Sequence, residues 1–175
     1  MPGLFGAVAV DSSLAIEPTD AKVILASMSE VLAHTGQHCE LWSDSSSGAY
    51  VGRVGPDKFN TVPWAGESNF GGHRAWSFVA GSLLRHPPAD SDDRSGIAKN
   101  FIEEGSQFLD KLQGPFTVLA HAKFPRETVI AVDRCAHIPL FYALHNGVLY
   151  FAPEIKALLC VPGLPLSRSV RRALR

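Results

Sequence analysis

Three side chains that could act together in catalysis lie close to one another in the segment VDRCAHIP. Asp133, Cys135 and His137 are each two residues apart, so a strand running through them would place all three on one face. A thiol, an imidazole and a carboxylate can serve as nucleophile, base and orienting group. The members of such triads usually converge from separate elements, however, whereas neighbours on one strand lie side by side. We therefore interpret these residues as the end of a strand and not as a catalytic group.

A second group of potential ligands contains His34, His38 and Cys39, whose spacing suggests a metal site. Gly36 is expected to end a helix between the two histidines, so they need not share a face. A histidine near a helix C-terminus also interacts favourably with the helix dipole. We expect no metal at this position, and without a CxxC pair we expect no structural zinc.

The run SDSSSG, residues 43–48, has the small polar composition of a phosphate-binding loop. No lysine follows it, and neither glycine-rich nucleotide fingerprint is matched. We predict instead a turn that joins two short strands within residues 39–54.

The charge balance and the apolar runs exclude several partner classes. The 175 residues carry 16 Lys and Arg against 17 Asp and Glu, and no basic-aromatic stripe, so we expect no nucleic-acid binding. The longest apolar runs are far shorter than a membrane span, and the N-terminus lacks the pattern of a signal peptide. Three widely spaced cysteines indicate reduced thiols. We expect a cytoplasmic protein with no membrane partner.

Hydrophobic periodicity identifies the elements that must position these side chains. Residues 4–10, LFGAVAV, form a short apolar run typical of a buried strand. Residues 18–36 show apolar side chains at helical spacing, with Thr19 or Asp20 as the expected N-cap. Residues 55–74 are rich in Gly, Pro and Asn, which predicts a long loop.

The second half of the chain continues with a strand, a helical region and more strands. After a strand at 75–84, residues 97–114 predict two helices divided at Gly105. Further strands follow, and Asn146-Gly147 between two of them is a strong hairpin signal. Residues 153–159, PEIKALL, predict a helix with its proline in the first turn. This order predicts an α+β domain with helices packed on antiparallel sheets.

Seven segments, taken in order, resemble the glutaminase domain of asparagine synthetase-type class II glutamine amidotransferases: MPGLFGAV, LAHTGQH, GAYVGRV, FVAGSLL, FLDKLQGPFTVLAHA, VDRCAHIPLFYA and LYFAPEIKALL. The most specific part is residues 108–159, whereas residues 55–74 match poorly. The resemblance implies a four-layer αββα sandwich of two antiparallel sheets flanked by helices, of the N-terminal nucleophile hydrolase type. It also implies a glutamine amidotransferase type 2-like domain at 1–160 and a linker at 161–175 toward a C-terminal synthetase domain.

Two positions that carry catalysis in the resembling family are degenerate in this sequence. Family members begin Met-Cys-Gly and use the exposed cysteine to attack the glutamine amide, whereas Pro2 stands in that place here. Loss of such a nucleophile reduces the rate on the order of a millionfold. The family's Asn-Gly oxyanion pair matches Ala80-Gly81, where Gly81 retains a backbone N–H but Ala80 lacks the amide, a loss of roughly a hundred- to a thousandfold. No catalytic residue is therefore expected.

The resemblance implies that the residues that hold the charged end of glutamine are better preserved in this sequence than the two catalytic positions. Arg53 in YVGRV matches the arginine that grips the α-carboxylate, with an ordinary structural arginine as the alternative. Asp93, or alternatively Asp92, falls where an acidic residue meets the α-amino group, although the expected Ser-Asp-Thr-Glu has become SDDRS. Residues 135–137, CAH, replace a Leu-Gly-Ile of the family and match scaffold positions.

The resulting hypothesis is a catalytically silenced glutaminase-like domain with a structural or regulatory role in an asparagine synthetase-like amide ligase. Related enzymes with a silenced glutaminase half include β-lactam synthetases and lasso-peptide cyclases. This domain needs no cofactor, whereas ATP and Mg are implied for a C-terminal or separate synthetase domain. One alternative is an active glutamine-hydrolysing amidotransferase that uses a thiol such as Cys39 or Cys135. The other is a stand-alone module that binds glutamine or another amino acid.

Overall fold

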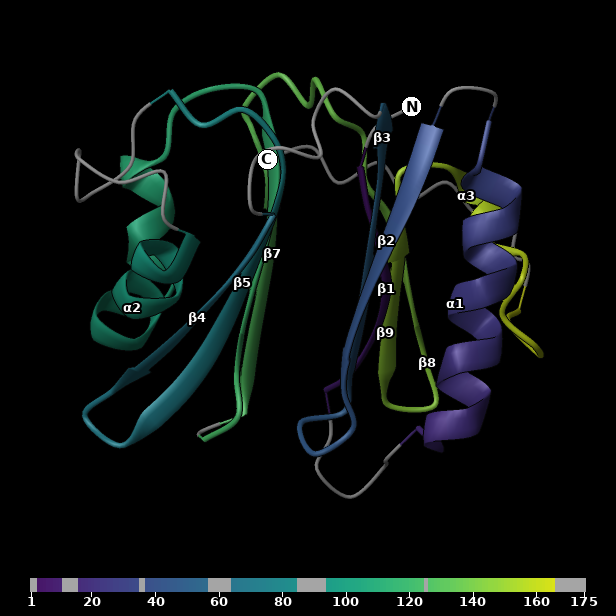
Figure 1. Cartoon of the computed structure of the whole chain (residues 1–175), viewed down its shortest axis with the longest axis horizontal. Helices are drawn as coiled ribbons and strands as arrows, with labels where there is room; N and C mark the ends of the chain where they lie inside the picture. Colours follow the sequence, from purple (N-terminus) through teal and green to yellow (C-terminus); the bar gives the residue numbers. More distant parts are fainter. Residues whose placement is uncertain are drawn as a thin grey trace.

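The computed structural model describes residues 3–10, 16–34, 37–56, 64–84, 94–124 and 126–165. It contains two antiparallel sheets that lie face to face, with helices on their outer faces (Figure 1). The first sheet, sheet A, has the strand order β2 (Gln37–Asp44), β3 (Ala49–Pro56), β1 (Gly3–Ala9), β9 (Val148–Ala152), β8 (Phe141–His145). Sheet B has the order β4 (Ala65–Phe70), β5 (His73–Gly81), β6 (Phe116–Ala122), β7 (Glu127–Val132). The helices are α1 (Pro18–Leu32), α2 (Arg94–Glu104), the 3-10 helix η2 (Gly105–Lys111) and α3 (Ile155–Leu158).

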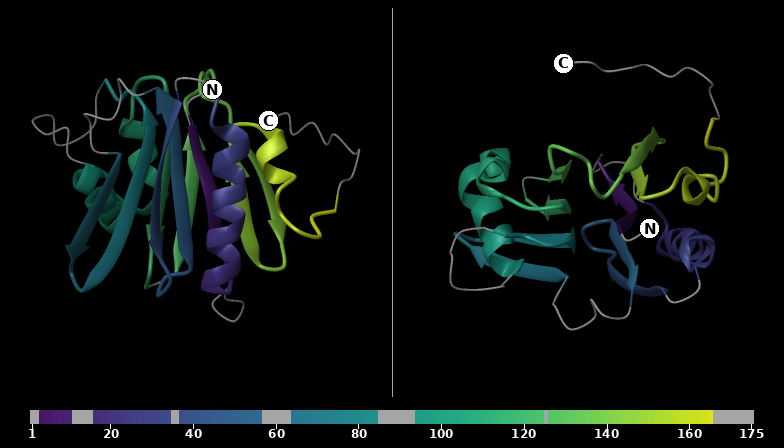
Figure 2. Two further views of the ribbon diagram at one scale, coloured as in Figure 1. Left: turned by 45° about the vertical axis from the view of Figure 1, so that its right-hand side comes forward. Right: turned by 90° about the horizontal axis from the view of Figure 1, so that it is seen from above.

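The hydrophobic core is divided into three layers by the two sheets. One cluster joins α1 and α3 to sheet A, a second lies between the sheets, and a third joins sheet B to α2 and η2. Strand β3 shows why: Ala49 and Val51 face the other sheet, whereas Tyr50 and Val54 face α1. A view from above shows α1 and α2 on opposite outer faces with both sheets between them (Figure 2). The sequence of β1 is a continuous apolar run because both faces of the strand are buried.

Two local predictions from turn residues are confirmed. Asn146 and Gly147 have φ values of 49° and 72°, and they join β8 to β9 with His145 opposite Val148. The predicted turn at residues 45–48 joins β2 to β3, and Asp44 Oδ1 accepts hydrogen bonds from the backbone N and the Oγ of Ser46 at 2.9 and 2.6 Å. The α+β class with two antiparallel sheets and few helices is confirmed as well.

The prediction of one long loop over residues 55–74 is wrong at its start, where β3 extends to Pro56, and in its second part. Strand β4 lies there and pairs with β5 through a tight turn at Gly71 and Gly72, whose φ values are +60° and +81°. The sequence of β4, AGESNF, has few apolar residues because β4 is an edge strand. Residues 57–63 lie outside the described part of the chain.

Helix boundaries differ from the predicted ones at both proline-containing starts. The N-cap of α1 is Glu17, followed by Pro18, so Thr19 and Asp20 lie inside the helix and do not cap it. Gly36, the predicted stop, lies outside the described residues, and α1 already ends at Leu32. A fixed proline φ is suited to the first helical turn, which explains the earlier start of α1.

The later helical segments also differ in detail from the predictions. Pro153 precedes the N-cap Glu154 of α3, so it is not in the first turn as predicted. The region predicted as two helices divides at Gly105, as expected, but its second half is a 3-10 helix. The longest helix, α1, has 15 residues, and in the described ranges no helix is long and apolar enough to cross a membrane.

Candidate functional site

Arg53 lies near the end of β3, in the layer between the two sheets. It is opposite Leu4 of β1 on one side and Glu40 of β2 on the other. Only 9% of the residue is exposed, and strand alternation places it on the same face as Val51, which packs against sheet B. The predicted carboxylate-binding arginine is therefore buried at the edge of the inter-sheet core.

The Arg53 guanidinium already has a carboxylate partner. Its Nη2 atom lies 2.5 Å from Oε2 of Glu40, whose side chain is 31% exposed. The guanidinium carbon also lies 5.7 Å from the centroid of the Trp64 ring, which in turn is 5.6 Å from Phe78 of β5. Arg53 thus links β2 to sheet B through aromatic contacts. Its role toward an amino-acid ligand stays a prediction, and such a ligand would have to share Arg53 with Glu40.

Ala80 and Gly81 form the end of β5. Ala80 is 2% exposed and packs in the apolar layer between the sheets, so no polar side chain replaces the amide of the family's asparagine. Gly81 has a φ of +95°, and a Cβ atom there would lie 2.2 Å from the Pro115 carbonyl oxygen and 2.5 Å from Cδ1 of Ile138. The backbone conformation and the packing therefore both require a glycine at this position, whether or not it has a catalytic role.

Pro2, Asp93 and its alternative Asp92 lie outside the described residues, so their predicted roles stay predictions. Their neighbours are described. Gly3 is opposite Val54, the residue that follows Arg53. Arg94, at the start of α2, accepts a hydrogen bond on its backbone oxygen from Ser77 Oγ at 2.5 Å.

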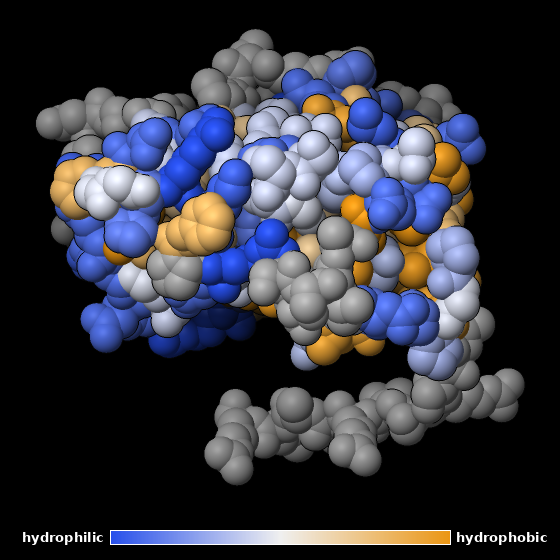
Figure 3. Space-filling model, turned by 90° about the horizontal axis from the view of Figure 1, so that it is seen from below, coloured by the Kyte–Doolittle hydropathy of each residue, from blue (hydrophilic) through white to orange (hydrophobic). Residues whose placement is uncertain are grey.

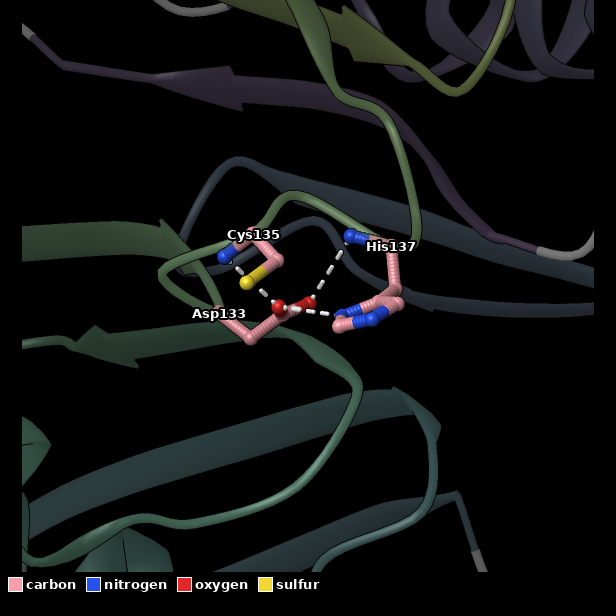
Figure 4. A group of neighbouring side chains, drawn as sticks. All are labelled: Asp133, Cys135 and His137. Atoms are coloured by element: carbon pink, nitrogen blue, oxygen red, sulfur yellow. Dashed lines mark hydrogen bonds and ion pairs between the residues drawn. The ribbon is translucent and has the colours of Figure 1, made fainter.

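Asp133, Cys135 and His137 follow directly after β7, which ends at Val132, so their interpretation as strand-end residues is confirmed. Figure 4 shows their side chains gathered around the Asp133 carboxylate. Oδ1 accepts hydrogen bonds from the Cys135 backbone N at 3.0 Å and from His137 Nδ1 at 2.7 Å, and Oδ2 accepts one from the His137 backbone N at 3.1 Å. Burial raises the pKa of Asp133, but the hydrogen bonds from His137 and the Cys135 backbone outweigh it, so the pKa lies below its usual value.

Ala136 explains why this turn matches a glycine in the resembling family. Its φ of 49° lies in the left-handed region, which glycine adopts without strain and alanine does not. The position between Cys135 and His137 therefore has a backbone conformation that a glycine would adopt without strain.

The other group of potential ligands, for which no metal was expected, makes separate contacts. Cys39 Sγ lies 3.8 Å from the Ser29 carbonyl oxygen of α1, and His34 Nε2 lies 3.2 Å from Glu154 Oε1. His38 is exposed on β2. Within the described ranges, the one group of three potential metal ligands is Asp133, Cys135 and His137.

A pocket of about 480 Å³ lies at the other end of sheet A, between the start of α1 and the turn that joins β8 to β9. Its lining includes apolar residues such as Ile16 and Val23. Its polar and aromatic lining residues are Glu17, Asp20, His145, Asn146 and Tyr150. Viewed from below, the molecule shows more apolar surface on the side of α1 and sheet A than on the side of α2 (Figure 3). This pocket is remote from the end of β3 that carries Arg53.

Glu40 and Trp64, which both contact Arg53, were not predicted from the sequence as parts of the site. The signal for Glu40 was present, because the turn at residues 45–48 pairs Asp44 with Ala49 and thereby places Glu40 opposite Arg53. Trp64 gave no such signal, since it precedes the edge strand that was predicted to be a loop.

Comparison with known proteins identifies the family. Residues 85–173 match the family described as "Glutamine amidotransferase domain", a segment that includes Asp93 and Asp133 but not Pro2, Arg53 or Ala80. The chain is also similar to asparagine synthetase [glutamine-hydrolyzing] 2 of Bacillus subtilis (strain 168), with 31% identity over 93 residues, which is 53% of this chain and 12% of that protein. The chain therefore spans only a small part of that relative's length. The family match and the two antiparallel sheets agree, and the chain belongs to the glutamine amidotransferase domain family.

Proposed function

We propose that this chain is a glutaminase-like domain that does not hydrolyse glutamine and that has a structural or regulatory role in an asparagine synthetase-like, ATP-dependent amide ligase. The observation that carries the proposal is Pro2, which stands where the resembling family has its nucleophilic cysteine. Proline has no side-chain nucleophile, and no thioester with the glutamine side chain can form there.

Two described residues support the same conclusion. Ala80 presents a methyl group within the apolar inter-sheet layer, where an oxyanion site needs a hydrogen-bond donor. Arg53 is paired with Glu40, so the protein itself supplies a carboxylate to the group that would hold the substrate. The nucleophile and the oxyanion donor thus depart from what hydrolysis requires, and a substrate carboxylate would have to share Arg53 with Glu40.

The wider proposal concerns architecture and partners. The helix layer, two sheets and second helix layer fit a four-layer αββα sandwich of the N-terminal nucleophile type, at residues 1–160. Residues 161–175 would connect it to a synthetase domain that binds ATP and Mg, in a cytoplasmic protein. A β-lactam synthetase-like or lasso-peptide cyclase-like enzyme would suit it, because such enzymes take nitrogen from a substrate amine.

The rival function is an active amidotransferase that uses another thiol. Cys39 is half-buried against α1, on the face of sheet A that points away from sheet B. Cys135 is exposed, but His137 directs Nδ1 to Asp133 and is itself 61% exposed. Cys39 packs against α1 and Cys135 is exposed to solvent, whereas amide hydrolysis needs an enclosed site lined by hydrogen-bond donors, and we therefore favour the silenced domain.

The test is glutamate release from glutamine by the purified chain, together with mass spectrometry for a glutamyl thioester. We expect no release above a protein-free control and no adduct. Release that disappears in Cys39→Ser or Cys135→Ser would instead establish the active amidotransferase.

A second measurement addresses the stand-alone binding module. We expect calorimetry with millimolar glutamine or glutamate to give no saturable heat. Saturable heat that is lost in Arg53→Lys, which retains the charge but not the bidentate geometry, would establish amino-acid binding.

A further inference from the structure

The turn after β7 gathers three different metal-ligating side chains on one short segment. The ligand atoms of Asp133, Cys135 and His137 all lie within 4.8 Å of one another. Figure 4 shows the thiol and the imidazole on either side of the carboxylate. This cluster has no role in the proposed function, and the inference below goes beyond that function.

One of the three ligands is held rigidly by the fold. Asp133 is 8% exposed, and its carboxylate accepts backbone N–H groups from Cys135, His137 and, at 3.3 Å, Phe116 of β6. The Asp133 backbone N also donates to the Phe116 carbonyl oxygen at 3.0 Å. The carboxylate position is therefore fixed relative to sheet B before any ligand arrives.

The other two ligands are accessible from solvent. Cys135 is exposed and the His137 side chain is 61% exposed, so their side-chain torsions are free of core packing. Zinc bonds of roughly 2.0–2.3 Å place neighbouring tetrahedral ligands about 3.3–3.8 Å apart. A movement of about 1 Å by two exposed side chains brings the cluster to that spacing.

We propose that Asp133, Cys135 and His137 bind a zinc ion, with water as the fourth ligand. A thiolate, an imidazole and a carboxylate form a mixed donor set that zinc accepts, whereas calcium and magnesium prefer oxygen ligands. Binding releases the Cys135 thiol proton to solvent. The proton of His137 Nδ1 is exchanged through solvent to Nε2, so that Nδ1 is free to ligate, and bonds to the metal replace the hydrogen bond between His137 and Asp133. The dication neutralises a thiolate and a carboxylate that otherwise repel each other.

The experiment uses the chain without an affinity tag and with cobalt as a spectroscopic probe. Tetrahedral cobalt bound to a thiolate gives a charge-transfer band in the near ultraviolet and intense visible bands, and added zinc displaces it. We expect one equivalent of cobalt to produce these bands. We expect Cys135→Ser to abolish the charge-transfer band and His137→Gln to weaken zinc affinity at least about tenfold.

Matched controls separate this site from adventitious thiol binding. Cys39→Ser and Cys160→Ser remove the other two cysteines and should leave the bands unchanged. Circular dichroism checks that each variant is folded. The side chains of Cys135 and His137 are exposed, so substitution of these two residues should not disturb the core. Absence of the bands in the wild-type chain, or bands of full intensity in folded Cys135→Ser, would overturn the proposal.

Discussion

Arg53 of β3 and Glu40 of β2 face each other across the edge of sheet A, with Nη2 2.5 Å from Oε2. The Arg53 side chain is 10% exposed, so most of its charge lies away from water. A charged acceptor in such a desolvated position stabilises a guanidinium more than an exposed one does, so Glu40 stabilises Arg53 here. The pair therefore contributes to the edge of the inter-sheet core.

This relationship predicts that Glu40→Gln lowers the free energy of unfolding by about 1–2 kcal/mol, because Arg53 loses a charged acceptor in a desolvated position. Glu67→Gln is the matched control, since the pair of Glu67 and Arg74 has a similar 2.6 Å contact but side chains that are 46% and 45% exposed. That exposed pair should contribute less than about 0.5 kcal/mol. Urea denaturation measures the unfolding free energy of both variants. Equal losses in Glu40→Gln and Glu67→Gln would show that the buried pair contributes no more than the exposed pair.

Gly81→Ala should destabilise the fold by about 3 kcal/mol or more, because a Cβ atom would collide with the Pro115 carbonyl oxygen at a left-handed φ. Gly72→Ala separates the two causes. Its φ is +81°, but no atom lies within 4 Å of the added Cβ, so only the backbone cost of about 1–2 kcal/mol remains. Thermal or urea unfolding tests the ranking, and a Gly81→Ala variant no less stable than Gly72→Ala would refute the packing requirement.

His121 should make the stability depend on pH below neutrality. It is fully buried between the sheets and stacks on Trp76 with centroids 5.9 Å apart. Burial lowers its pKa to about 4, with the charge of Arg126 acting in the same direction and Asp44 and the Ser47 backbone opposing. The unfolded chain therefore binds the proton first, and stability falls as the pH drops from 6.5 toward 4.

Between pH 7 and pH 5 this histidine should cost about 2 kcal/mol of unfolding free energy. His121→Gln should remove that dependence while retaining a polar group near Thr128, whose Oγ1 is 2.8 Å from Nδ1. His38→Gln, at an exposed position on β2, is the matched histidine-to-glutamine control. Urea titrations at the two pH values measure the difference in unfolding free energy. If His121→Gln shows the same difference as the wild-type chain, the pH dependence belongs to other groups.

The sequence predicts best where local chemistry decides the structure. The hairpin at Asn146-Gly147 was predictable because two consecutive residues with positive φ require such side chains. Strand β4 was missed because its composition is polar, although Gly71-Gly72 between it and β5 is a local hairpin signal. The candidate site follows the same rule. Arg53 and Gly81 could be identified as candidate site residues from the sequence. The contact of Arg53 with Trp64 could not, because it depends on how the two sheets pack.

The earlier glycine-to-alanine substitutions are predicted to lower stability, whereas the reverse substitution at Ala136 is predicted to raise it. Its φ of 49° is strained for alanine by about 1–2 kcal/mol, whereas glycine is unstrained there but loses more entropy on folding. Ala136→Gly should therefore raise the free energy of unfolding by about 0.5–1 kcal/mol. Ala131→Gly, within β7, is the matched control and should lower stability by about 1 kcal/mol, because the flexible unfolded chain gains entropy without any release of strain. Parallel urea titrations distinguish the two, and destabilisation by both substitutions would show that the left-handed turn at Ala136 is not strained.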